Sequence, residues 1–199
     1  MDLLMRRREM MLAAAGGRNG TEWDYTLGLP AENGWTKEVS SSSFKDSLGE
    51  SYVSLSGNSS SGYIRYIWPE YNPVCSFEAE ISFVNNNNFQ MYLSDGVDKV
   101  IRIRAQYSQN YKGIYLYTGT TLSTMTKLQS ISTGTFYKIK LALDGEVGYV
   151  YVDDVLVADS VDLSTIVSTT YATGLQYAPS ANSTIAGKLR SMSLKLGMI

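Results

Sequence analysis

The fold is decided by the stretch Phe136–Asp159, which reads FYKIKLALDGEVGYVYVDDVLVAD. Apolar and polar residues alternate along it in three runs, and a period of two residues is that of a β-strand. Asp144-Gly145 and Asp153-Asp154 separate the runs, and such pairs of turn-forming residues favour tight hairpins. The stretch therefore predicts three consecutive antiparallel strands joined by two short turns.

The chain from residue 21 onward repeats this pattern of short alternating segments and turns. In Cys75–Val84 the odd-numbered positions up to Phe83 are apolar, whereas the even-numbered positions 76 to 82 are Ser or Glu. Further strands are predicted at residues 52–56, 63–67, 89–94, 100–105, 114–118, 174–177 and 185–196. Many short strands without a second helical pattern indicate an all-β domain, residues 21–199, built from two packed antiparallel sheets.

The stretch Phe136–Asp159 resembles the late strands of concanavalin A-like lectin/glucanase (laminin-G-like) jelly-roll domains. In that group an aromatic-x-Ile-x-Leu strand leads through a turn into Val-Tyr-Val-Asp-Asp-x-Leu-Val-Ala, and residues 137–141 and 150–158 match these patterns. The segment FEAEISF at 77–83 is also similar to a mid-domain strand of the group. The resemblance spans about residues 22–197 and implies a two-sheet antiparallel jelly roll. Lectins, lyases, hydrolases and structural modules share this fold, so the resemblance alone implies no single function.

Composition excludes several classes of function. Seventeen Lys and Arg against nineteen Asp and Glu give a net charge of −2, which rules out a broad basic surface for nucleic acid. Histidine is absent, so mechanisms that need an imidazole base or ligand are excluded. Cys75 is the one cysteine and cannot form an internal disulfide. No apolar run approaches the ~20 residues of a membrane span.

Residues 1–20 are predicted to form an N-terminal docking helix and linker. MDLLMRRREMMLAAA consists mostly of strong helix formers, with Asp2 as a candidate N-cap and Gly16-Gly17 as the end. A helix this short is only marginally stable by itself in water. Residues 1–16 are therefore expected to dock on the domain, on sister subunits or on a larger virion assembly. A signal peptide and a local nucleic-acid contact by the three arginines are the competing interpretations, and Glu9 interrupts the signal-peptide pattern. This opening resembles those of small fibre or appendage proteins of phages from gut bacteria.

The strands predicted at 75–84, 89–94, 100–105 and 114–118 follow one another closely, so they are expected to form one antiparallel meander. If their apolar side chains face the core, the opposite side chains share one outer face. These side chains are Glu78, Glu80, Gln90, Tyr92, Arg102, Arg104, Tyr115 and Tyr117. Tyrosine rings stack on sugars, while Arg and Glu bind hydroxyls, so the face is a candidate carbohydrate-binding site. The competing interpretation is simple cross-strand pairing of Glu with Arg, with tyrosines present for their β-propensity.

Catalysis is a further competing interpretation of the same face. Hydrolases of the resembling group carry Glu-x-Asp-x-x-Glu, whereas Glu78 and Glu80 are followed by Phe83 at the third position. A lyase of the same fold would need a His or Tyr base beside an arginine, for which Tyr92 and Arg102 remain. The sequence requires no cofactor, although calcium is a candidate ligand of the turn aspartates Asp95, Asp98, Asp153 and Asp154.

Together these observations predict a non-enzymatic module at a virion or extracellular surface, a structural or adhesion component that binds a glycan or host polysaccharide. The alternatives are a glycoside hydrolase or lyase of the same fold, and a purely structural assembly protein.

Overall fold

The computed structural model of this chain describes residues 20–57, 62–68, 72–84, 87–95, 99–117, 125–163, 172–179, 187–197 and 199. The helix predicted over residues 1–16 lies outside the described residues. Two short 3-10 helices, η1 (Tyr25–Leu27) and η2 (Pro30–Asn33), follow the first strand. Among the described residues, no helix has the length and hydropathy needed to cross a bilayer.

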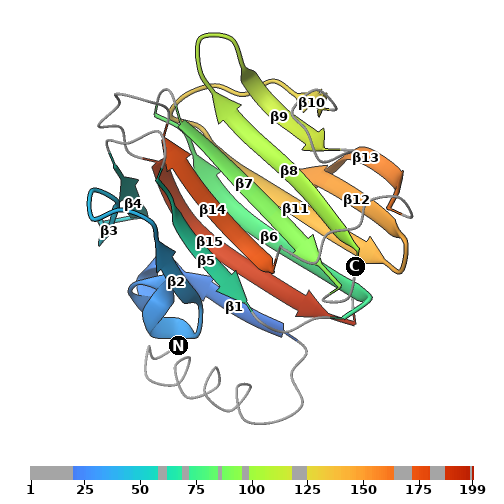
Figure 1. The fold of residues 1–199 in the computed structure, drawn as a ribbon, viewed down its shortest axis with the longest axis horizontal. Coiled ribbons are helices and arrows are strands. Elements are labelled where there is room, and N and C mark those ends of the chain that lie inside the picture. Colours follow the sequence, from blue (N-terminus) through green and yellow to red (C-terminus); the bar gives the residue numbers. More distant parts are fainter. Residues whose placement is uncertain are drawn as a thin grey trace.

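The described strands form two antiparallel sheets, which Figure 1 shows as overlapping layers. Sheet A runs in the order β13 (Val155–Asp162), β12 (Val147–Val152), β11 (Phe136–Asp144), β6 (Val74–Ser82), β15 (Gly187–Leu196), β4 (Val53–Ser56) and β3 (Lys45–Leu48), and β1 (Gly20–Asp24) pairs with β15. Sheet B runs in the order β10 (Met125–Gln129), β9 (Lys112–Tyr117), β8 (Val100–Tyr107), β7 (Asn87–Ser94), β14 (Thr173–Pro179), β5 (Ile64–Trp68) and β2 (Thr36–Val39). The predicted all-β sandwich of two antiparallel sheets is confirmed.

The core lies between the two sheets and is built from the apolar half of each alternating strand. Phe77 and Ile81 on β6 are completely buried, as the odd-even pattern predicts. Across the interface Phe83 meets Phe89 edge to face with 5.4 Å between ring centroids. Trp35 and Trp68 pack together in the same cluster, 5.4 Å apart. Burial of such large side chains contributes roughly 1.5–3 kcal/mol each and is the main stabilising term of the fold.

The stretch Phe136–Asp159 forms the hairpins that its pattern predicts. β11 pairs with β12, and β12 pairs with β13, in antiparallel register. The second turn is Asp153-Asp154, with both residues at positive φ (51° and 65°), as a type I′ turn requires. The first turn lies one residue later than predicted, at residues 145–146, because Asp144 still pairs with Val147.

The four-strand meander predicted for residues 75–118 is wrong in one element. β6 is hydrogen-bonded to β11 on one side and to β15 on the other, so it has no free edge for β7. After β6 the chain instead crosses to sheet B, where β7, β8, β9 and β10 form the true meander. A strand that faces the core from either sheet has the same alternation, which is why the pattern did not distinguish a hairpin from a crossover.

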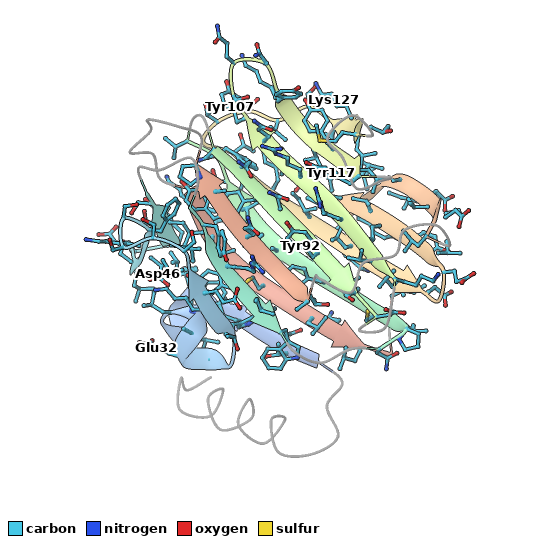
Figure 2. The ribbon with its side chains drawn as sticks, in the orientation of Figure 1. Glu32, Asp46, Tyr92, Tyr107, Tyr117 and Lys127 are labelled. Carbon is cyan, nitrogen blue, oxygen red and sulfur yellow. The ribbon has the colours of Figure 1, made fainter. Side chains whose placement is uncertain are left out.

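A buried polar cluster links the two sheets near one edge of the sandwich, where Figure 2 labels Asp46. The carboxylate of Asp46, on β3 of sheet A, lies 2.5 Å from Lys37 Nζ and accepts a hydrogen bond of 2.6 Å from the Tyr66 hydroxyl. Lys37 and Tyr66 are cross-strand neighbours on β2 and β5 of sheet B. Burial raises the pKa of Tyr66 well above its usual value, and the bond to Asp46 and its charge raise it further.

Candidate functional site

Six of the eight predicted site residues lie together on the outer face of sheet B. Their strands β7, β8 and β9 bury alternate apolar residues such as Met91 and Ile103, which turns the intervening side chains outward. Figure 2 shows Tyr92 and Tyr117 on the broad face of this sheet, with Lys127 at its edge strand β10. The six residues are Gln90, Tyr92, Arg102, Arg104, Tyr115 and Tyr117.

The strand register arranges this outer face in three parallel rows that run across the strands. The tyrosine row consists of the cross-strand neighbours Gly174, Tyr92, Arg102 and Tyr117. The central row consists of Gln176, Gln90, Arg104 and Tyr115, and Lys127 on β10 continues it. The amide row consists of Ala178, Asn88, Gln106 and Gly113. Amide and guanidinium groups from three strands, β14, β7 and β8, therefore occupy one continuous surface.

The tyrosine row is packed around an arginine. The Arg102 guanidinium carbon lies 3.8 Å from the Tyr117 ring centroid and 5.8 Å from that of Tyr92. Tyr92 donates a hydrogen bond of 2.7 Å to Gln90 Oε1, which joins this row to the central one. Tyr92 and Tyr117 are only 4% and 3% exposed. Their ring faces are therefore packed within the surface rather than displayed, and their role is to hold Arg102 and Gln90 in place.

The central and amide rows contain buried polar atoms that no described residue satisfies. Arg104 Nη1 donates to the Tyr117 hydroxyl at 3.4 Å, but Arg104 Nε is buried without a partner in the described part of the chain. Asn88 is 6% exposed, and its Oδ1 likewise has no partner among those residues. Buried polar groups in native proteins are nearly always hydrogen-bonded, so these atoms indicate a surface that a ligand can complete.

Glu78 and Glu80 do not belong to this surface, which corrects the prediction that all eight residues share one face. Both lie on β6, so their side chains project from the outer face of sheet A. Each carboxylate meets a cation there: Glu80 lies 2.6 Å from Arg190 Nη1, and Glu78 lies 3.6 Å from Lys138 Nζ. Cross-strand ion pairing, the competing interpretation of these two residues, is what the structure shows.

The described turn aspartates accept hydrogen bonds from backbone N–H groups or pair with a lysine. Asp95 Oδ1 accepts from the Lys99 backbone N–H at 3.0 Å, and Asp153 Oδ1 accepts from that of Lys138 at 2.9 Å. Asp154 pairs with the Lys138 ammonium at 2.9 Å, and Asp98 lies outside the described residues. Within the described ranges no three Asp, Glu or Cys side chains gather closely enough to hold a metal ion.

Sequence reasoning missed several residues of the outer face. Gln176 is the cross-strand neighbour of Gln90, but its strand lies more than eighty residues further along the chain. Asn88 and Gln106 lie just outside the strands predicted at 89–94 and 100–105. The alternation of their strands gives the direction of each side chain, but the strand order, which brings them together, comes from long-range pairing.

Comparison with known proteins supports the fold. No family model matches the sequence, and no curated protein sequence matches it either. Among solved structures, 90% of this chain superimposes on a sialidase with a TM-score of 0.65 and 11% identity, and it spans 18% of the sialidase chain. A conserved carbohydrate esterase from the Shiga toxin-encoding bacteriophage phi24B gives a TM-score of 0.62 at 11% identity, with coverage of 89% of this chain and 99% of the esterase chain.

A third similar structure is the carbohydrate binding module CBM66 from Bacillus subtilis. The TM-score is 0.54 at 13% identity, and the match covers 81% of this chain and 95% of the module. These likenesses are to proteins of very different sequence, so they concern the fold alone. The chain has the jelly-roll architecture of lectin- and glucanase-like domains, as its sequence resemblance implies.

Proposed function

We propose that this domain is a non-catalytic carbohydrate-binding module that holds its glycan on the outer face of sheet B. The observation that carries the proposal is the continuous surface of the central and amide rows, where buried atoms of Arg104 and Asn88 have no partner in the described part of the chain. Side-chain amides offer both donors and acceptors, and a guanidinium offers five donors in a fixed plane, which together suit sugar hydroxyls. The CBM66 likeness adds support, because a module of that fold is named for carbohydrate binding.

Contact through polar groups is the binding mode proposed for this surface. Tyr92 and Tyr117 are packed against Arg102, so stacking of a sugar on their rings is not part of the proposal. Tyr111 is the more accessible ring: it is 44% exposed and stands edge-on to Tyr115 with 5.9 Å between centroids. The glycan would lie across the central row, with Tyr111 at one end as an aromatic contact.

A glycan array with paired variants tests the proposal. Gln90→Ala and Arg104→Ala each remove one polar group of the central row, and each is expected to weaken binding about tenfold, the effect of one hydrogen bond from a charged or well-placed group. Glu78→Gln on the outer face of sheet A is the matched control and is expected to bind like the wild type. Equal binding of a glycan by all four proteins would overturn the site on sheet B, and no binding to any glycan would leave only the purely structural role.

The hydrolase alternative predicts turnover that depends on the carboxylates of β6. A general acid must stay protonated, typically in an apolar pocket, whereas Glu80 is paired with Arg190 at 2.6 Å. We therefore propose the non-enzymatic role, and a Glu80→Gln variant tests it. Polysaccharide cleavage by the wild type that is lost in Glu80→Gln would overturn the non-catalytic assignment.

We further propose that the module serves in phage adhesion. The likeness to the esterase of bacteriophage phi24B, which covers 99% of that chain, supports a phage setting. The proposal would be supported by capsid or tail genes next to this gene, or by detection of the protein in purified virions by mass spectrometry. It would be contradicted by neighbouring metabolic genes together with absence of the protein from virions.

A further inference from the structure

The described strand residues on the outer face of sheet B include more cations than carboxylates. Arg65, Arg102 and Arg104 project from β5 and β8, and Lys127 projects from edge strand β10. Among the described strand residues of this face, the one carboxylate is that of Glu38 at the opposite edge. It lies 3.5 Å from Arg65 Nη1 and so neutralises the arginine farthest from Lys127.

The outer face of sheet A shows the opposite arrangement. Lys138 pairs with Asp154 at 2.9 Å and with Glu78 at 3.6 Å. Arg190 pairs with Glu80 at 2.6 Å. The whole protein carries a net charge of −2, so the excess of cations over carboxylates among the described strand residues of the outer face of sheet B is a local feature. A face of one charge sign attracts ligands of the other sign and speeds their association.

Arg104 stands at the centre of this positive surface. Gln90 and Tyr115 are its cross-strand neighbours, and no described carboxylate lies within ion-pair distance of its guanidinium. Its side-chain hydrogen bond to the Tyr117 hydroxyl is long at 3.4 Å, and its Nε is buried without a partner among the described residues. A planar guanidinium in this state is suited to an anion that accepts two parallel hydrogen bonds, as a carboxylate or sulfate does.

We infer that the ligand of this surface is an acidic saccharide, whose anionic group pairs with the guanidinium of Arg104. The inference rests on the proposed carbohydrate-binding function and specifies the chemical class of its ligand. Gln90 lies beside Arg104 in the central row with Gln176 beyond it, and Asn88, whose Oδ1 has no partner among the described residues, lies in the next row. These amides bind the hydroxyls of the same sugar units, so one saccharide satisfies both the charge and the unpartnered polar atoms.

Calorimetric titration of the full chain tests the inference with probes that differ in their acidic group. The probes are oligogalacturonate, oligomannuronate, a sialylated oligosaccharide and a sulfated galactan oligosaccharide that contains no uronic acid. Each carboxylated probe is paired with its carboxyl-reduced neutral form, and the sulfated probe with its desulfated form. The acidic forms are expected to bind at least about tenfold tighter than the neutral forms, the usual effect of a charge-assisted bond. Because the contact is ionic, this preference is expected to shrink as salt rises from about 50 to 300 mM.

The variant that carries the test is Arg104→Gln, which keeps hydrogen-bonding capacity but removes the charge. It is expected to lose the preference for the acidic form while binding the neutral form within about twofold of the wild type. Arg104→Lys is expected to keep part of the preference, because it retains the charge without the planar fork. Arg190→Gln makes the same chemical change on the outer face of sheet A and is expected to bind like the wild type. Thermal unfolding of each variant establishes that it is folded.

The outcomes separate this inference from the function on which it rests. Tighter binding of a carboxylated or a sulfated probe supports the inference and identifies the anionic group. Equal binding of acidic and neutral forms overturns it but leaves the carbohydrate-binding function standing. Failure of every saccharide, acidic or neutral, overturns both. Binding of a single-stranded oligonucleotide more tightly than any saccharide overturns the saccharide assignment and shows a surface for nucleic acid.

Discussion

Asp46→Ala removes a carboxylate that ties the two sheets together near their β2–β3 edge. The side chain of Asp46 is 4% exposed, and its two oxygens serve different partners. One lies 2.5 Å from Lys37 Nζ, and the other accepts the Tyr66 hydroxyl at 2.6 Å. The substitution leaves an ammonium and a phenol facing each other without an acceptor, between sheets that otherwise meet through apolar side chains.

The expected loss follows from the burial of each partner. Removing one member of a fully buried ion pair costs about 3–5 kcal/mol, but the Lys37 side chain is 27% exposed and retains some hydration. Leaving the buried hydroxyl of Tyr66 without an acceptor costs about 1–3 kcal/mol. We expect Asp46→Ala to lower the free energy of unfolding by about 3 kcal/mol, or the Tm by roughly 6–12 °C for a domain of this size. Asp46→Asn keeps an acceptor for Tyr66 and is expected to lose about half as much.

Urea unfolding followed by tryptophan fluorescence measures these changes. Trp23, Trp35 and Trp68 are almost completely buried, so unfolding exposes all three to water. Asp154→Ala is the control: its side chain is 77% exposed and its pair with Lys138 is a surface contact of 2.9 Å. Exposed pairs typically contribute about 0.2–1 kcal/mol. If Asp46→Ala destabilises the protein no more than Asp154→Ala does, the buried contacts of Asp46 with Lys37 and Tyr66 do not stabilise the packing of the two sheets.

Three further predictions concern the core. The free energy of unfolding should stay constant up to about pH 10 and fall as the pH rises toward 12. Burial raises the pKa of Tyr66, and raises that of Tyr177 to about 12, so above pH 10 both phenols lose their protons when the chain unfolds. Urea titrations at pH 8, 10 and 11 that give equal stability would contradict this. Burial raises the pKa of Cys75 to about 12, so its thiol should resist a disulfide reagent at pH 8 until urea unfolds the chain, and rapid labelling of folded protein would refute its burial. Gly174→Ala would place a Cβ 2.1 Å from the Tyr66 backbone oxygen, so it should lower the free energy of unfolding by about 1–3 kcal/mol, a cost that an unchanged urea midpoint would disprove.

The strands and the orientation of their side chains could be predicted from the sequence because both depend on local alternation. Phe77 and Ile81 are completely buried, as the odd-even pattern of β6 requires. The turn at Asp153-Asp154 was also predicted, since both residues tolerate the positive φ of a type I′ turn. These features are set by residues adjacent in the chain, for which the pattern is direct evidence.

The order of the strands could not be predicted in the same way. β6 bonds to β15, more than a hundred residues away, so the edge that β7 was expected to occupy is already filled. This pairing places Glu78 and Glu80 on sheet A, and the separate pairing of β14 with β7 brings Gln176 beside Gln90. The error in the predicted site therefore arises from long-range hydrogen bonding, and no reassignment of side-chain orientation would have removed it.

The two outer faces differ in whether their polar groups are already satisfied, and the same substitution on each face should separate stability from binding. Arg190 Nη1 lies 2.6 Å from Glu80, and the guanidinium carbon lies 3.7 Å from the Phe136 ring centroid, so Arg190→Gln gives up contacts that exist in the free protein. It should lower the free energy of unfolding by up to about 1 kcal/mol, since the pair is partly exposed. Arg104 has one long hydrogen bond and an unpartnered Nε among the described residues, so Arg104→Gln should leave the free energy of unfolding within about 0.5 kcal/mol of the wild type. If Arg104→Gln instead proves the more destabilising of the two, Arg104 belongs to the scaffold, and the argument that the sheet-B face is left unsatisfied for a ligand fails.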